Sequence, residues 1–217
     1  MGAKASIIQA TRAHAPFLAR TILAASRSHL PRGPFDFALD LPDTELLTAI
    51  ERMALGDLVC NCHFTRFLVA EIAGTPVGAL AAFDPGEDGL PPLGAALLDA
   101  CSALGHSRQK LATIAARIEA LERCFPRAAP GTWIIEWVAV AEPYRRHGIC
   151  GQLTDVILAE GAGRGCREAQ ISTYIGNDAA AAAYARSGFV ATHEHRSVDL
   201  EDMLGVPGLW VMRRDLP

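Results

Sequence analysis

The chain has 217 residues, of which 50% are hydrophobic and 20% are charged, and this composition excludes a disordered chain. Lys and Arg number 20 against 24 Asp and Glu, so the net charge of −4 provides no basic excess for binding nucleic acid. We recognise neither an apolar run of roughly 18 residues, as a membrane span needs, nor a secretory leader. We therefore expect a cytoplasmic protein, in which any anionic ligand is held by a local feature.

The six cysteines indicate free thiols, because a chain of this length can form a core without cross-links. The segment Cys60-Asn61-Cys62-His63 looks like part of a metal site, but no second pair of ligands follows at zinc spacing. We expect a thiol pair there and no metal. The start of the chain, with Gly2 and Ser6, matches a myristoylation pattern, although the apolar run from Ile7 indicates a strand instead of a tethering arm.

Hydrophobic periodicity and turn residues predict an alternation of strands and helices. In chain order we expect a strand over 6–11, a helix over 13–26, a loop over 29–41, a helix from Asp43 or Thr44 to Gly56, strands over 64–72 and 77–83 with a turn at 74–76, helices over 93–104 and 107–125, a strand over 133–140, a helix over 149–161, a strand over 169–174, a helix over 177–188, and strands over 189–193 and 209–213. This order predicts an α/β (α+β) domain with a mixed sheet.

Residues 133–140 form the strongest predicted strand. They are apolar at nearly every position, which indicates that both faces are covered, and Glu136 is their only charge. Strict alternation places Glu136 on the same face as Val138 and Val140. A carboxylate there would be partly desolvated and could act as a general base, or it could pair with a neighbouring arginine.

The segment Arg145-Arg146-His147-Gly148-Ile149-Cys150-Gly151 lies between this strand and the next helix. Gly148 permits a close backbone approach, and the free N–H groups at a helix start favour an anion such as phosphate. The spacing matches neither a P-loop nor the dinucleotide fingerprint. A plain strand-to-helix turn with two surface arginines is the alternative.

A second pattern follows about 30 residues later. Asn177 is a good helix cap, and Ala180 and Tyr184 share one face of the helix that it begins. The small Ala180 leaves a groove beside the Tyr184 ring, where the phenol could give a proton to a leaving group. A tyrosine packed in the core is the alternative.

Together the two patterns resemble the GNAT superfamily of acyl-CoA N-acyltransferases. Residues 140–153 (V-x-x-P-x-R-R-x-G-I-x-G-x-L) resemble its acyl-CoA signature, and residues 177–189 (N-x-x-A-x-x-x-Y-x-x-x-G-F) resemble its second motif. The resemblance implies a mostly antiparallel mixed sheet, splayed between the fourth and fifth strands and flanked by helices. It implies one acyltransferase domain over 1–217, with a helical insertion at about 85–130 that could be a lid, a dimer surface or part of the core.

The resemblance also implies roles for individual residues. The pantetheine of acetyl-CoA would pair with the strand at Val138–Val140, and the Val138 N–H would stabilise the developing oxyanion. Tyr184 would protonate the departing thiolate, and Glu136 is the first candidate for the base, ahead of Tyr174, Glu71 and His193. The residues expected to bind coenzyme A are Val138, Ala139, Val140, Arg145, Arg146, His147, Gly148, Ile149, Cys150, Gly151, Asn177 and Tyr184.

The sequence therefore predicts an N-acetyltransferase that moves an acetyl group from acetyl-CoA directly to a primary amine. Its partners would be acyl-CoA and an amine acceptor, with a homodimer possible and no nucleic acid or membrane. Cys150 is not expected to be a nucleophile, because no His or Asp partner stands at a fixed spacing and direct transfer needs no covalent step. A non-catalytic acyl-CoA sensor or scaffold is the alternative function.

Overall fold

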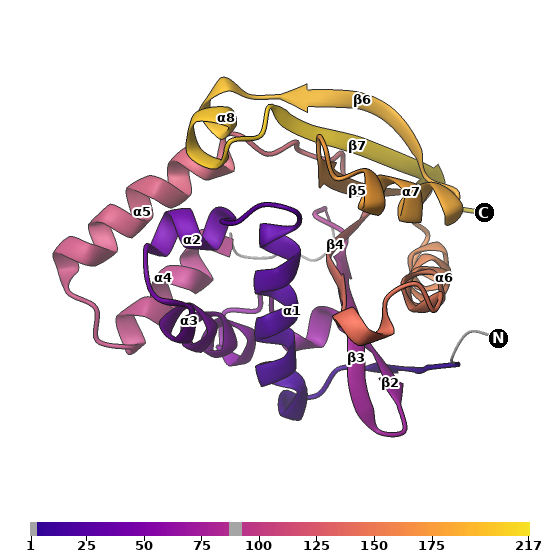
Figure 1. Cartoon of the computed structure of the whole chain (residues 1–217), viewed down its shortest axis with the longest axis horizontal. Helices are drawn as coiled ribbons and strands as arrows, with labels where there is room; N and C mark the ends of the chain where they lie inside the picture. The colour runs from indigo at the N-terminus through magenta and orange to yellow at the C-terminus, as the bar shows by residue number, and fades with distance from the viewer. Residues whose placement is uncertain (1–3, 87–92) are drawn as a thin grey trace.

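A seven-stranded sheet with the order β1-β2-β3-β4-β5-β7-β6 runs through the protein (Figure 1). The computed structural model describes residues 4–86 and 93–217, so Gly2 lies outside the described residues. The strands are β1 Ser6–Gln9, β2 Phe67–Ile72, β3 Thr75–Phe83, β4 Thr132–Val140, β5 Glu168–Tyr174, β6 Val190–Arg196 and β7 Gly208–Asp215. The central pair β4 and β5 is parallel and the other five neighbouring pairs are antiparallel, which confirms the mixed, mostly antiparallel sheet.

Two groups of helices cover the sheet. The helices are α1 Ala15–Arg27, α2 Pro34–Leu39, α3 Asp43–Leu55, α4 Leu93–Ala103, α5 Arg108–Glu122, α6 Ile149–Gly163, α7 Asp178–Arg186 and α8 Val198–Leu204. In Figure 1 the first five lie on one side of β4, here called the α1 side, and α6 and α7 lie on the other, here called the α6 side. Each side has its own buried apolar cluster, so β4 is covered on both faces as expected.

On the α6 side, a glycine lets the helix approach the sheet closely. A Cβ on Gly161 of α6 would stand 2.5 Å from the Trp133 ring of β4, so a larger residue would push helix and strand apart. The Trp133 indole N–H donates to the Ile157 carbonyl of α6 at 2.9 Å. This contact fixes the distance and orientation of α6 relative to β4, and so the place where α6 begins.

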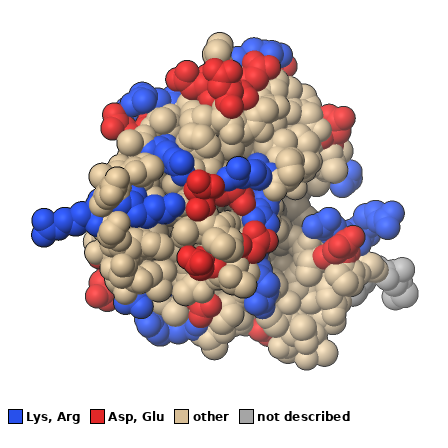
Figure 2. Space-filling view, turned by 60° about the vertical axis from the view of Figure 1, so that its left-hand side comes forward, with Lys and Arg blue, Asp and Glu red and all other residues tan. Residues whose placement is uncertain are grey.

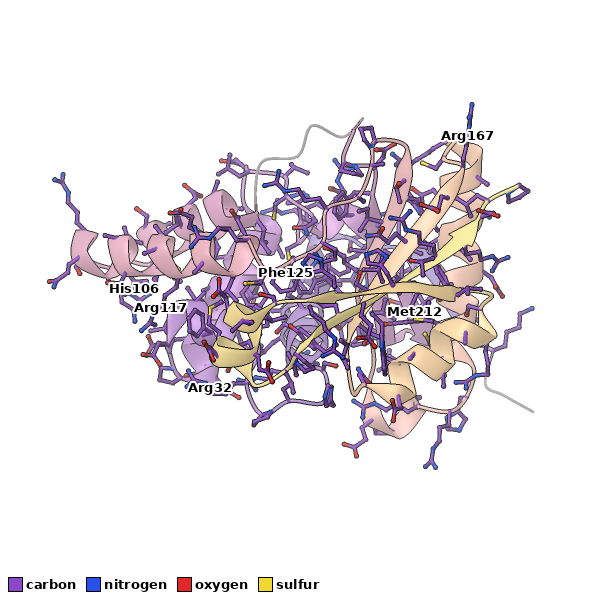
Figure 3. All side chains as sticks on the ribbon, turned by 90° about the horizontal axis from the view of Figure 1, so that it is seen from above. Arg32, His106, Arg117, Phe125, Arg167 and Met212 are labelled. Atoms are coloured by element: carbon purple, nitrogen blue, oxygen red, sulfur yellow. The ribbon has the colours of Figure 1, made fainter. Side chains whose placement is uncertain are left out.

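Helices α4 and α5, which lie in the segment expected to be an insertion, pack on the α1 side. Leu97 and Cys101 of α4 and Ile114 of α5 are buried in the cluster that contains α1 and α3. Arg117 of α5 donates to the Phe37 carbonyl of α2 and pairs with Asp40 at 3.6 Å. Figures 1 and 3 show α5 at the end of the molecule far from α6, with Arg117 and Arg32 there and Arg167 at the opposite end. The observed contacts of α4 and α5 are thus core packing.

Two short helices were not expected from the sequence. Residues 29–41 are not all loop, because Pro34 begins α2 and the Asp36 carboxylate accepts from the Gly33 N–H at 2.8 Å. Pro at the first position of a helix costs no hydrogen bond, so this proline starts a helix instead of breaking one. The other is α8, where the Ser197 hydroxyl accepts from the Leu200 N–H at 3.2 Å.

Other element boundaries differ from the expected ones by up to three residues. The tight turn between β2 and β3 falls at Ala73 and Gly74, both with positive φ, so β3 already begins at Thr75. Pro42, not Asp43 or Thr44, precedes the first residue of α3. Part of the acidic, Gly- and Pro-rich segment expected to open the insertion, residues 87–92, lies outside the described residues.

The surface carries mixed charge. On the face shown in Figure 2, acidic and basic side chains are interspersed among other residues, so this face has no patch of a single sign. Of the helices that the structure describes, none combines the length and the apolar stretch that a bilayer-crossing segment requires.

Candidate active site

The parallel strands β4 and β5 part halfway along their length. Their pairing runs from Thr132 opposite Glu168 to Ile135 opposite Ile171. Beyond that point β4 follows β3 as far as Val140, while β5 follows β7 as far as Tyr174. The gap between them exposes one backbone edge of the second half of β4.

Two residues direct their backbone groups into this gap. The Ala141 N–H donates to the Val77 carbonyl of β3 at 2.8 Å. Because backbone groups alternate sides along an antiparallel ladder, Ala139 also faces β3, opposite Ala79, whereas Val138 and Val140 face the β5 side. Of the three residues expected to pair with pantetheine, Val138 and Val140 therefore have the required direction and Ala139 does not.

The start of α6 forms a cradle of backbone N–H groups. Gly148 has a φ of 79° and Arg146 a φ of 63°, so the loop turns sharply into the helix. The first helical hydrogen bond runs from the Gln152 N–H to the Gly148 carbonyl, which leaves the N–H groups of Ile149–Gly151 outside the helical ladder. No side chain among the described residues caps this end, whereas Ser107 caps α5 and Asn177 caps α7.

Open space lies in front of the cradle. A Cβ placed on Gly148 or on Gly151 would meet no atom of the described residues within 4 Å. Unpaired N–H groups and the positive end of a helix dipole favour an anion, and the space admits the backbone close to it. The residues present therefore fit a diphosphate group.

Two side chains of the loop are held by the loop itself. The Arg145 Nε–H donates to the Val140 carbonyl at 3.0 Å, and the His147 Nδ1–H donates to the Arg145 carbonyl at 2.8 Å. Both residues are exposed, as is Arg146. Arg145 thus hydrogen-bonds one of the two backbone carbonyls that face the gap. This contact holds its guanidinium beside the cradle, where it can add a charge-assisted hydrogen bond to an anion.

Helix α7 lies beside the cradle and carries Tyr184. The Tyr184 ring is 8% exposed and packs edge-on against Phe189, with ring centres 6.5 Å apart. Burial, with a smaller contribution from the nearby Cys150 thiol, raises the pKa of Tyr184 well above its usual value. The phenol is therefore protonated at neutral pH, as a proton donor must be.

Asn177 and Cys150 have structural surroundings. The Asn177 Oδ1 accepts from the Ala180 N–H at 3.1 Å, and its Nδ2–H donates to the Ser28 hydroxyl at the end of α1. Of the two roles considered for Asn177, this geometry supports the ordering of the helix start. Burial raises the pKa of the Cys150 thiol, so the thiolate that a nucleophile needs is disfavoured.

Glu136 does not lie on the face that strict alternation predicts. The register between β3 and β4 shifts there, with Ala81 opposite Glu136 but Ala79 opposite Ala139, so Trp137 is an extra residue with a φ of 56°. This β-bulge leaves Val138 and Val140 on the α6 side, while Trp137 packs into the α1 cluster. Glu136 lies on the α1 side opposite Ala81, and the expectation that it shares a face with Val138 and Val140 is wrong.

The surroundings of Glu136 make it a weak acid. Its Oε2 accepts from the Asn61 Nδ2–H at 2.6 Å. Burial raises the pKa of Glu136 to about 7, and the hydrogen bond from Asn61 opposes that rise. A carboxyl group that titrates near neutral pH is suited to accept a proton during turnover.

The weaker candidates for the base are engaged elsewhere. Glu71 accepts from the His14 ring at 3.1 Å, and the Tyr174 hydroxyl donates to the Ser26 carbonyl at 3.4 Å. His193 is exposed on the edge strand β6. Cys60 and Cys62 are buried free thiols, and within the described residues no group of three or more His, Cys, Asp and Glu side chains could hold a metal ion.

Asn61 is the residue of this site that the sequence did not reveal. It stands in the segment between α3 and β2, 75 residues before Glu136, and no spacing rule connects the two. The sequence interprets the neighbouring Cys60 and Cys62 as a thiol pair or as metal ligands, and neither interpretation involves Asn61. A polar residue between two buried ones was the available signal, since such a residue needs a buried partner.

Comparison with solved structures shows the same fold in acetyltransferases. An acetyltransferase crystal structure aligns with 98% of this chain and 100% of its own at 16% identity and a TM-score of 0.69. An N-acetyltransferase from Staphylococcus aureus Mu50 aligns over 96% and 98% at 18% identity and a TM-score of 0.64. A putative acetyltransferase from Salmonella typhimurium, solved with its cofactor acetyl-CoA, aligns over 99% and 95% at 15% identity and a TM-score of 0.55.

Sequence comparison identifies the family. No curated protein sequence matches the chain. The sequence model of the acetyltransferase (GNAT) family matches residues 37–189, which include the parting strands, the cradle, Glu136 and Tyr184. The chain therefore belongs to the GNAT acetyltransferase family and is an acyltransferase.

Proposed function

We propose that the protein is an N-acetyltransferase that moves an acetyl group from acetyl-CoA directly to a primary amine. The observation that carries this proposal is the bulge in β4. It puts Val138 and Val140 on the α6 side, with backbone groups presented to the gap, while the Glu136 carboxyl group stays on the α1 side next to the point where β4 leaves β5. Residues 1–217 act as one domain in this proposal, with α4 and α5 as part of its α1 side.

The diphosphate of acetyl-CoA binds in the cradle at the start of α6. The N–H groups of Ile149–Gly151 donate to it, and Arg145 and Arg146 add positive charge. The backbone of Val138 and Val140 pairs with the pantetheine arm in the gap, as a further strand would. The acetyl-CoA found in the Salmonella typhimurium structure supports a site of this class in the shared fold.

Glu136 acts as the general base. Its carboxylate accepts a proton from the acceptor ammonium group, and the neutral nitrogen then forms a bond to the thioester carbonyl carbon. The Val138 N–H donates to the carbonyl oxygen, where negative charge develops. A pKa of about 7 keeps a useful fraction of Glu136 ionised at neutral pH while leaving it basic enough to take the proton.

Tyr184 acts as the general acid. The carbon–sulfur bond breaks as the amide forms, and the phenol gives its proton to the departing thiolate. The raised pKa of Tyr184 keeps the proton on the phenol until the thiolate forms beside it. As the amide forms, its nitrogen loses a second proton, which returns through water to the Tyr184 phenolate. Protonated Glu136 then releases the first proton to water, so the net products are the amide, free coenzyme A and one proton.

The test uses binding and turnover on the full chain. Acetyl-CoA should raise the melting temperature and ATP should not, because the cradle and the gap together match a diphosphate that carries a pantetheine arm. Thiol release from acetyl-CoA should then depend on an amine from a library of small amines, amino acids and peptides. The proposal would be contradicted if ATP raised the melting temperature and acetyl-CoA did not, or if no amine accelerated thiol release.

A further inference from the structure

A single side chain, Asn61, holds the Glu136 carboxyl group. Its Nδ2–H donates to Glu136 Oε2 at 2.6 Å, which is short for a hydrogen bond between nitrogen and oxygen. The two residues come from the α3–β2 segment and from β4, so only the tertiary fold brings them together. The contact forms on the α1 side, because Ile135 faces the α6 side and Glu136 alternates with it.

The other half of the Asn61 amide is unsatisfied. Its Oδ1 is buried and has no hydrogen-bond partner among the described residues. Leaving a buried acceptor unpaired destabilises the folded protein, so an asparagine kept only for folding would be expected to pair both halves. The half that is paired contacts the candidate base, and the half that is not remains available to a donor.

We propose that Asn61 is a positioning residue for acetyl transfer: its amide N–H fixes the Glu136 carboxylate, and its carbonyl oxygen accepts an N–H from the incoming amine. This inference rests on the proposed function. An ammonium group has three N–H donors, so it can contact both Glu136 and Asn61 Oδ1 and still carry its substituent. Asn61 would thus set the angle between base and nucleophile.

The groups that surround Glu136 leave Asn61 as its hydrogen-bond partner. Cys62, from the same segment as Asn61, lies close enough to feel the charge of Glu136. Burial is the main cause that raises the pKa of the Cys62 thiol. His63 bonds Thr65 through its ring. On β3, Ala81 stands opposite Glu136 and offers no polar side-chain atom.

The first experiment is an infrared titration of the unligated protein. The Glu136→Gln variant identifies the carboxyl band of Glu136 by its loss. Because the Asn61 hydrogen bond favours the ionised form, the Asn61→Ala variant should move the midpoint of that band upward by about one pH unit. Asn61→Asp, which removes the donor and adds a carboxyl group, should move it further. An unchanged midpoint in Asn61→Ala overturns the inference without touching the proposed function.

The second experiment is steady-state kinetics with the best amine of the library. Asn61→Ala should lower kcat about tenfold, raise the KM for the amine about tenfold and leave the KM for acetyl-CoA unchanged. In the Glu136→Gln background the same change should affect kcat less than twofold, since the carboxylate it orients is absent. Asp57→Asn, an exposed change in the same segment, is the matched control and should leave midpoint and kinetics as they are.

The outcomes separate the two proposals. A full tenfold loss of kcat on top of Glu136→Gln, or an unchanged amine KM in Asn61→Ala, overturns the role of Asn61. Full turnover in Glu136→Gln would instead show that Glu136 is not the general base of the proposed function, whatever the titration shows.

Discussion

In the proposed reaction the two sides of β4 contribute different kinds of chemical group. On the α6 side the candidate site is made mainly of backbone, the N–H groups at the start of α6 and the edge of β4 at Val138 and Val140, with Tyr184 as its proton-donating side chain. On the α1 side it is made of side chains, with Glu136 held by Asn61. The bulge at Trp137 separates the two, because it directs neighbouring residues of one strand to opposite sides.

This difference explains why one half of the site is visible in the sequence and the other is not. A backbone cradle requires glycine at a positive φ and a fixed distance between strand and helix, and both leave a pattern along the chain. A pair of side chains from distant segments leaves none. Variants on one side of β4 should change either turnover or acetyl-CoA affinity and spare the other quantity, which tests whether the two sides act separately.

The largest effect is expected on the α1 side, for Glu136→Gln. Loss of a general base lowers kcat about 10²- to 10⁴-fold, because no other group takes the proton in the transition state. Acetyl-CoA affinity should change less than twofold, since the cradle lies on the other side of the sheet. Thiol-release kinetics and calorimetry measure the two quantities, and a parallel loss of both would contradict the separation of the two sides.

The next effect is expected for Tyr184→Phe. The substitution keeps the ring and its contact with Phe189 but removes the proton, so kcat should fall about 10²-fold while acetyl-CoA affinity is nearly unchanged. The matched control is Tyr144→Phe in the turn that follows β4, which should turn over normally. Equal rates for Tyr184→Phe and the wild type would show that the thiolate leaves without this proton donor.

The two short helices show what local patterns can reveal. Ser197 and Gly205 are ordinary start and stop signals for α8, so that helix was predictable from the sequence. Helix α2 was harder, because Gly33-Pro34 reads as a turn unless the Asp36 side chain is known to bond the Gly33 N–H. In both cases the missing information lay within a few residues of the helix.

The face of Glu136 was not predictable in this way. A bulge with positive φ is normally signalled by glycine, and here the residue is Trp137, whose ring packs on Phe35 of α2 with ring centres 5.7 Å apart. Tertiary packing thus overrides the local preference of the chain. The same holds for the Asn61 contact, which depends on where the α3–β2 segment crosses the end of β4.

Although Glu136→Gln should lower kcat, it should raise the stability of the folded protein at high pH. The pKa of Glu136 is raised from its usual 4.5 to about 7 in the folded protein, so the folded state binds the proton more tightly than the unfolded state. Its favourable contribution is complete below pH 4.5 and is lost as the pH rises through 7. At pH 8 the variant should therefore be more stable than the wild type by about 3 kcal/mol.

Thermal melts between pH 4.5 and 8 measure this effect. The difference in melting temperature should grow with pH to about 6–12 °C, and it should be close to zero at pH 4.5. A difference that stays constant across this range would mean that Glu136 is not a buried, weakly acidic carboxyl group. The base would then be sought elsewhere on the α1 side.

The smallest effect is expected on the α6 side, for Gly148→Ala. Gly148 has a φ of 79°, which costs an alanine about 1 kcal/mol, and the new methyl group would project into the open space where the diphosphate approaches the backbone. Acetyl-CoA should bind about tenfold more weakly, with kcat at saturation nearly unchanged. Gly105, between α4 and α5, has a φ of 86° and equally open surroundings, so Gly105→Ala should cost the same stability and leave acetyl-CoA affinity intact. Equal acetyl-CoA affinity in the two variants would mean that strain, not the approach of a ligand, is what Gly148 accommodates.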